Sequence, residues 1–353
     1  SQLYPDYVKK RKRNRLCKRV GIGALAVIVA AVCAVGGYTA WYSSALNNAL
    51  SMGSEQDASV DAVLTAREVG QPFYMLLLGS DSCEGSGTST NPAMQGDNQR
   101  SDVMILARVD AQNRQVTLVS VPRDTPYTLD DGSVVKINEV YNIEGSAGSI
   151  KAVSELTGVP ISHYAEVHFS EFQEIVDKLG GITVDVPIEM SYKDALTGDK
   201  VTIRARRANA RRPTSPDFRR AFVTNTAITR RRSGKATSVR YLSAIIEKVL
   251  QKPVTELPGT ILDLAESVGT DMDTSDIVSL GLTFSGGSGG MTMYSCTGPS
   301  NGDFDEANNG LWLCYENPEG WAKLMGVVDS GEDPSGLDVE STAIVPPALD
   351  EAA

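Results

Sequence analysis

Histidine and cysteine are scarce in this chain, with 2 and 5 copies in 353 residues. No Cys-x-x-Cys pair and no histidine cluster occurs, which argues against a zinc site. Basic residues are in deficit, since 33 Lys and Arg stand against 44 Asp and Glu and give a net charge of −11. An acidic surface repels phosphates, so the composition argues against nucleic acid as a partner. The 41% apolar and 22% charged residues are typical of a globular protein.

Charge is absent from one stretch near the N-terminus, the 23 residues from Val20 to Tyr42. As a helix this run would be roughly 35 Å long, enough to cross a bilayer core of about 30 Å. It is too long for a cleaved signal peptide and has no clear cleavage site. Basic residues at 9–19 place the N-terminus in the cytoplasm, and Trp41 marks the far interface. We therefore predict a single-pass protein of the cell membrane, with a basic cytoplasmic N-terminus (1–19), a transmembrane helix (20–42) and the remaining residues outside the cell.

The cysteines fit this placement. Cys17 and Cys33 would be cytoplasmic or within the membrane, whereas Cys83, Cys296 and Cys314 would lie outside, where oxidation is possible. We expect Cys296 to pair with Cys314 and Cys83 to stay free, although the spacing does not fix the connectivity.

Strand and helix patterns alternate from residue 71 to residue 327. A polar, partly helical stalk (43–70) precedes them, and an acidic tail (328–353) that we expect to be disordered follows them. The patterns predict strands at 73–79, 103–110, 115–122, 163–169 and 182–187. They predict helices at 149–158, 170–181, 242–252, 260–269 and 275–284. This alternation predicts an α/β fold for residues 71–327, a three-layer αβα sandwich in which helices cover a mixed β-sheet.

Charged and polar residues gather in four segments of this domain: LLLGSDS (76–82), NQRSDVMIL (98–106), SVPRDTPYTL (120–129) and KINEVYNIEG (136–145). Two carboxylates beside two guanidinium groups are what a pyrophosphate bridged by Mg²⁺ needs, because hard oxygen ligands hold the ion and Arg matches phosphate oxygens. Taken singly, each of these residues is as well explained by a structural role: an Asp at a strand end as a turn former, an Arg as half of a surface ion pair, and a Lys as a solvated charge. The candidates are Asp81, Arg100, Asp102, Arg123, Lys136 and Asn138.

In this order the segments resemble the LytR–CpsA–Psr (LCP) family of membrane-anchored wall-polymer transferases. The motifs that carry the resemblance are Gly-Ser-Asp, Arg-Ser-Asp, Ser-Val-Pro-Arg-Asp-Thr, Lys-Ile-Asn and, from His163, the pattern HY…F..F..IVD.LGGI.V.V. They cover residues 71–201 closely and 242–327 loosely. The resemblance implies a phosphotransferase that takes a glycopolymer, of teichoic acid or polysaccharide type, from a polyprenyl-pyrophosphate carrier to a peptidoglycan sugar hydroxyl.

The resemblance also implies roles for single residues. Asp81 and Asp102 would hold Mg²⁺ (or Mn²⁺), and Arg100 and Arg123 would clamp the pyrophosphate. Lys136 and Asn138 would bind the pyrophosphate on one wall of the site, and Arg100, Asp102 and Arg123 would be the catalytic group. The apolar segments 170–182 and 242–250 would either line a slot for the lipid tail or serve as ordinary core faces.

Two other functions stay open. The protein could be a catalytically inactive, membrane-tethered binder of lipid-linked or anionic wall glycan with a regulatory role. It could also be a pyrophosphatase that releases the glycan to water. Product analysis with and without the peptidoglycan acceptor would separate the transferase from the pyrophosphatase, and Arg123→Ala would separate an enzyme from a binder.

One window does not fit the acidic chain, because residues 202–240 hold 11 Arg and 1 Lys against the single acid Asp217. Three pieces of the window can be written as DNA codons that, read one or two bases later, encode other amino acids. These are the segments that the family pattern expects there, in the expected order. We therefore hypothesise that residues 204–241 are translated out of frame and that this chain has weakened or no transferase activity. The rival interpretations are a basic arm for anionic polymer or membrane, and an extra Arg cluster on the pyrophosphate.

Overall fold

The computed structural model describes residues 37–50, 54–68, 70–80, 101–186, 190–193, 200–203, 206–210, 237–265, 267–285, 290–305 and 311–339. The chain divides into two compact units, residues 1–48 and 49–353. Residues 37–50 are helical, and within this helix the ring of Tyr38 lies 6.0 Å from that of Trp41. In the described ranges no helix is both long and apolar enough to span a membrane, and most of the predicted span at 20–42 lies outside those ranges.

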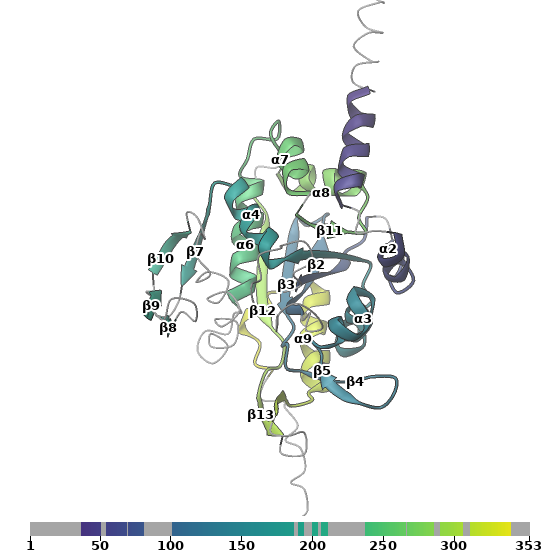
Figure 1. The fold of residues 1–353 in the computed structure, drawn as a ribbon, viewed down its shortest axis with the longest axis vertical. Coiled ribbons are helices and arrows are strands. Elements are labelled where there is room, and N and C mark those ends of the chain that lie inside the picture. Colours follow the sequence, from purple (N-terminus) through teal and green to yellow (C-terminus); the bar gives the residue numbers. More distant parts are fainter. Residues whose placement is uncertain are drawn as a thin grey trace, which may run out of the picture. The chain divides into compact units, whose positions relative to one another are not determined.

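A six-stranded mixed sheet forms the centre of the second unit, in the order β11-β6-β1-β2-β3-β12 (Figure 1). The strands β1, β2 and β3 form an antiparallel meander, β6 and β12 add to its two edges in parallel, and β11 pairs antiparallel with β6. The sheet confirms the predicted mixed α/β fold. Its strands are β1 (Phe73–Ser80), β2 (Ser101–Asp110), β3 (Gln115–Ser120), β6 (His163–His168), β11 (Gly269–Thr270) and β12 (Thr292–Thr297).

Helices lie against both faces of the sheet because β2 is buried on both sides. Met104 and Leu106 enter one hydrophobic cluster with side chains of α2, α3 and α9, while Ile105 and Val109 enter a second cluster with α4, α6 and α8. The predicted apolar segments at 170–182 and 242–250 thus contribute core faces. The helices are α2 (Ser54–Asp61), α3 (Val140–Thr157), α4 (Phe169–Lys178), α6 (Thr237–Leu250), α7 (Leu257–Ala265), α8 (Thr274–Ser285) and α9 (Pro318–Ser330), with a 3-10 turn η3 (Pro334–Gly336).

Four two-stranded sheets surround this core. They are β4 (Pro126–Thr128) with β5 (Val134–Lys136), β7 (Ile182–Val186) with β10 (Arg206–Ala210), β8 (Met190–Lys193) with β9 (Lys200–Ile203), and β13 (Gly302–Asp305) with β14 (Leu311–Cys314). The predicted strand at 182–187 therefore forms, but outside the central sheet. Of residues 204–241 the structure describes 206–210 in β10 and 237–241 in α6, and neither element tests the reading frame.

Two predicted boundaries need correction. The later part of the stalk expected at 43–70 packs against the core, because Val60 is fully buried and the Thr65 amide donates to the Ile161 carbonyl at 2.8 Å. The tail expected from residue 328 begins too early, since Val328 and Val339 are buried in the first cluster. In both segments a few apolar side chains, widely spaced in an otherwise polar sequence, are enough to attach the segment to the core.

The expected disulfide is also absent. Cys296 and Cys314 are both buried thiols, the first on β12 in the first hydrophobic cluster and the second on β14. The Cys314 thiol lies 3.8 Å from the Ser300 carbonyl oxygen. Cys83 lies outside the described residues.

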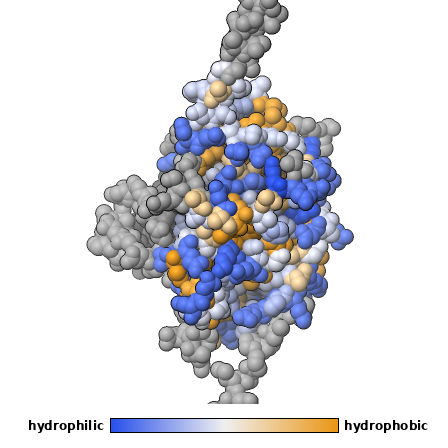
Figure 2. Space-filling model, turned by 90° about the vertical axis from the view of Figure 1, so that its right-hand side faces the viewer, coloured by the Kyte–Doolittle hydropathy of each residue, from blue (hydrophilic) through white to orange (hydrophobic). Residues whose placement is uncertain are grey.

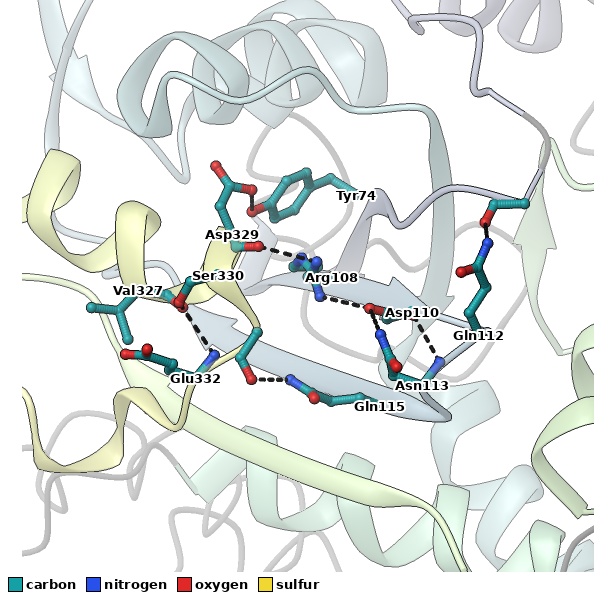
Figure 3. A network of polar contacts seen from close by, with 12 residues as sticks. Tyr74, Arg108, Asp110, Gln112, Asn113, Gln115, Val327, Asp329, Ser330 and Glu332 are labelled. Carbon is teal, nitrogen blue, oxygen red and sulfur yellow. Dashed lines mark hydrogen bonds and ion pairs between the residues drawn. The ribbon is translucent and has the colours of Figure 1, made fainter.

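A polar network fastens the end of α9 to the sheet (Figure 3). Arg108 lies 3.4 Å from Asp110 and donates to the Asp329 carbonyl at 3.2 Å, while the Tyr74 hydroxyl donates to the Asp329 carboxylate at 2.5 Å. Burial, assisted by the Asp329 carboxylate, raises the pKa of Tyr74. These groups lie at or beside the C-terminal end of β2, away from Asp102 at its start, and the described contacts of Asp110 also include Asn113. We interpret the network as structural.

The face shown in Figure 2 is mainly hydrophilic, with hydrophobic patches that are separate from one another. The elements α2, α3, β4 and β5 lie on that side of Figure 1, and their exposed apolar side chains include Val134 and Ile143. Apolar residues scattered in this way are normal on protein surfaces.

Candidate functional site

Asp102 sits at an irregularity in the pairing of β1 with β2. Gly79 pairs with Val103 and Ser80 pairs with Ser101, so Asp102 is the extra residue of a β-bulge. A bulge changes the direction in which its side chain points, and bulges are frequent beside active sites. The Asp102 side chain keeps 16% of its surface exposed although β2 is otherwise deeply buried.

Arg123 reaches Asp102 from the loop that follows β3. The turn is fixed by the Thr125 hydroxyl, which donates to the Pro122 carbonyl at 2.7 Å. Arg123 Nη1 then donates to Asp102 Oδ1 at 2.9 Å. The Arg123 side chain remains 32% exposed, and among the described residues its Nη2 has no hydrogen-bond or ion-pair partner. Arg123 can therefore keep its carboxylate partner and still donate to a ligand.

Asn138 completes the surroundings of Asp102 from the segment before α3. Its backbone amide donates to the Arg123 carbonyl and its own carbonyl accepts from the Ser101 amide, both at 3.4 Å. Its side-chain Nδ2 donates to Asp102 Oδ1 at 3.3 Å. Asn138 is only 4% exposed, and its Oδ1 has no partner in the described part of the chain. A buried acceptor without a partner is rare, because it loses its hydrogen bond to water without compensation.

Lys136 is directed elsewhere, to Asp124. Its Nζ donates to Asp124 Oδ1 at 2.9 Å, and Arg123 Nε lies 3.7 Å from Asp124 Oδ2. Cations and anions therefore alternate through Asp102, Arg123, Asp124 and Lys136. We call Asp102, Arg123, Asp124, Lys136 and Asn138 the wall of the site. The Cys314 amide donates to the Asp124 carbonyl at 2.9 Å, which joins the β13–β14 hairpin to this wall.

The structure thus brings together four of the six predicted site residues: Arg123 and Asn138 contact Asp102 directly, and Lys136 joins them through Asp124. Asp124 follows Arg123 directly, and an Arg-Asp dipeptide carries no signal that its two side chains will bind different members of a cluster. Asp81 and Arg100 lie outside the described residues.

Two oxygens of this wall, Asp102 Oδ2 and Asn138 Oδ1, are potential ligands for a hard cation. Within the described residues, Arg123 and Asn138 both contact Asp102 Oδ1 and none contacts Oδ2. Asp102 Oδ2 and Asn138 Oδ1 are oxygen donors of the type that Mg²⁺ prefers. The arrangement can therefore present one guanidinium to an anion and two oxygens to a cation at the same place.

Comparison with known proteins supports a single family. A model described as the LytR_cpsA_psr family matches residues 37–319. The polyisoprenyl-teichoic acid–peptidoglycan teichoic acid transferase TagU of Halalkalibacterium halodurans is 27% identical over 324 residues, which cover 87% of this chain and 95% of that protein. The corresponding transferase TagV of Bacillus subtilis is 29% identical over 195 residues, or 53% of this chain, and the match spans about half of TagV, 46%.

The crystal structure of Bacillus subtilis TagV has the same fold. It superposes with a TM-score of 0.52 at 23% identity and covers 76% of this chain and 100% of that chain. At this identity the likeness shows the fold alone.

Proposed function

Because the chain belongs to the LytR_cpsA_psr family, we propose that it is a membrane-anchored phosphotransferase that moves a glycopolymer from a polyprenyl-pyrophosphate carrier to peptidoglycan. The relatives named as teichoic acid transferases support transfer to peptidoglycan at the level of the family. Residues 20–42 would be the anchor and would leave the catalytic unit outside the cell. The observation that carries the proposal is the cluster of Arg123, Asp102 and Asn138, which three separate motifs assemble beside the start of β2 and the end of β3.

The reaction forms one phosphorus–oxygen bond and breaks another. The acceptor hydroxyl attacks the phosphorus that carries the glycan, the bridging bond of the pyrophosphate breaks, and polyprenyl phosphate leaves while the proton of the hydroxyl passes to water. Catalysis of such a transfer consists mainly of positioning and charge neutralisation. Arg123 would bind a phosphate oxygen through its Nη2, and its pairing with Asp102 would keep the guanidinium in a fixed orientation.

Arg100 and Lys136 would add positive charge to the same wall. Arg100 directly precedes Ser101, the first residue of β2, and Lys136 uses one of its three donors on Asp124. Asn138 would act on the carboxylate rather than on the pyrophosphate, because the only described contact of its side-chain NH₂ group is with Asp102.

Mg²⁺ or Mn²⁺ fits this wall. Asp81 and Asp102 would hold the ion together with Asn138 Oδ1, whose lack of a partner is the observation that favours a cation there. When bound, the ion would neutralise charge that develops on the diphosphate.

The proposal is tested with a synthetic polyprenyl-pyrophosphate glycan and purified peptidoglycan, with detection of polyprenyl phosphate and of glycan bound to the wall. Glycan release that requires the acceptor supports the transferase, release into water supports the pyrophosphatase, and binding without release supports the inactive binder. A chain with the reading frame restored over 204–241 is assayed in parallel, because we expect the printed sequence to be impaired.

Arg123→Ala supplies the decisive variant. Loss of one donor to the developing charge should reduce turnover about 100- to 1,000-fold. Lys151→Ala is the matched control, since it removes a cation that pairs with exposed Asp130 at 3.0 Å away from the cluster. Equal turnover in the two variants would refute the assignment of Arg123.

A further inference from the structure

Asp124 is a carboxylate that two cations of the wall share. Its Oδ1 accepts from Lys136 Nζ at 2.9 Å, and its Oδ2 lies 3.7 Å from Arg123 Nε. Only 14% of its side chain is exposed, against 32% for Arg123. A negative charge at this place repels an anionic ligand, because like charges oppose each other. The presence of Asp124 beside a candidate phosphate site therefore needs an explanation other than its charge.

The two carboxylates of the wall hold Arg123 at different nitrogens. Asp102 Oδ1 accepts from Nη1 at 2.9 Å, whereas Asp124 forms an ion pair with Nε that is too long for a hydrogen bond. The guanidinium is planar and its donors have a fixed geometry. A single contact leaves this plane free to turn about that contact, and a second contact at another nitrogen restricts the turn. Asp102 and Asp124 together therefore fix the direction in which Nη2 of Arg123 points.

The backbone of the loop that carries Arg123 and Asp124 is held by contacts that use neither side chain. The Ile137 amide donates to the Thr125 carbonyl at 2.8 Å, and the Cys314 amide donates to the Asp124 carbonyl at 2.9 Å. These contacts tie the loop to the segment after β5 and to β14. A substitution that changes only the Asp124 carboxylate should therefore leave the loop in place.

We propose that Asp124 is a positioning residue, whose carboxylate holds the Arg123 guanidinium and the Lys136 ammonium in the orientation from which they donate to the diphosphate. The proposal rests on the proposed function for the identity of that anion. An ionised carboxylate has no donor for a phosphate oxygen, so Asp124 acts through its two cations. Correct orientation of the donors offsets the repulsion between Asp124 and the ligand.

The test measures binding of inorganic pyrophosphate to the full chain in detergent by isothermal titration calorimetry, without divalent cation, so it needs no turnover. Asp124→Asn removes the charge and keeps the size of the side chain. In the parent background the loss of charge and the loss of orientation have opposite effects, so the affinity should change by less than about twofold. In an Arg123→Lys background the guanidinium and its contact at Nε are gone, so the loss of charge should dominate and tighten binding about tenfold.

Asp276→Asn is the matched control for the removal of charge. Asp276 lies on α8, outside the wall, and its Oδ1 lies 2.8 Å from Arg67 Nη2 in a comparable ion pair. This substitution should leave the pyrophosphate affinity within about twofold in both backgrounds.

Turnover gives a second readout that a purely structural role would not produce. Asp124→Asn should lower kcat for glycan transfer about tenfold or more per folded molecule, because misplaced groups lose most in the transition state. KM for the lipid-linked glycan should not rise, since binding of the anion keeps its cations and loses a repulsive charge.

The outcomes separate this proposal from the proposed function. Equal tightening by Asp124→Asn in the two backgrounds would show that the carboxylate acts by charge alone and would overturn the proposal, as would a parent chain that binds no pyrophosphate. The expected coupling in a chain that transfers no glycan would overturn the function and leave the positioning role intact. If Asp124→Asn fails to fold, Asp124→Glu decides the question. It keeps the charge and moves the carboxylate, so the proposal requires about a tenfold loss of pyrophosphate affinity and is overturned by an unchanged one.

Discussion

Replacing Asn138 by alanine should cost activity but little stability, whereas the same replacement of Asn317 should do the reverse. Both side chains are nearly buried, at 4% and 3% exposure. Asn317 caps α9 by accepting from the Gly320 amide at 2.8 Å, and its Nδ2 donates to the Val339 carbonyl at 3.0 Å. Asn138 makes one long contact of 3.3 Å to Asp102, and its Oδ1 has no described partner.

The magnitudes follow from these contacts. Asn317→Ala removes a cap worth about 1 kcal/mol and leaves a buried carbonyl unpaired at about 1–3 kcal/mol, so we expect about 2–4 kcal/mol of destabilisation. Asn138→Ala loses a hydrogen bond of about 1 kcal/mol but also removes the unpaired oxygen, whose burial costs about as much, so the free energy of unfolding should change by less than about 1 kcal/mol.

Urea unfolding gives both free energies, and the glycan transfer assay gives the activity per folded molecule. We expect transfer to fall about 100-fold or more in Asn138→Ala and to be unchanged in Asn317→Ala. A loss of stability in Asn138→Ala as large as that in Asn317→Ala would refute the reasoning, because it would show that Oδ1 serves the fold.

Three further results are expected. Truncation after Ser330 should destabilise the protein by about 2–4 kcal/mol in urea unfolding, because it removes buried Val339 and the partner of the Asn317 amide, whereas truncation after Val339 should have little effect. Burial raises the pKa of Asp110, but hydrogen bonds from Asn113 and the charge of Arg108 outweigh it and lower the pKa below its usual value. Its ionised form therefore stabilises the fold above about pH 4, so the stability difference between the parent and Asp110→Asn should be full at pH 6 and shrink as the pH falls below about 4. Sequencing of the DNA over codons 200–245 should reveal shifted frames, and a chain with the frame restored should transfer more glycan; an uninterrupted frame would refute the hypothesis.

Much of the fold could be predicted because its central strands are continuous apolar runs. β1, β2 and β3 follow one another as a meander, so neighbouring runs in the sequence become neighbours in the sheet. β12 could not be placed in the same way. Most of its residues are only partly buried, and it pairs in parallel with β3, from which it is more than 170 residues distant along the chain.

The site was predictable as a set of segments but not as a set of contacts. Asp102 is exposed to a ligand because of a bulge, and a bulge is a property of two paired strands rather than of either sequence. Asp124 gave no signal for a related reason. It is a common polar residue whose role depends on a partner that the fold brings from another element.

The described wall of the site does not depend on the basic window. Within the described residues, every side-chain polar contact of Asp102, Arg123, Asp124, Lys136 and Asn138 is made among residues 102–138. A shifted frame at 204–241 would therefore leave this wall in place, while the segments that the family pattern expects in that window would be missing. Cation binding and glycan transfer should then be separable in this chain, because only transfer would need the missing segments.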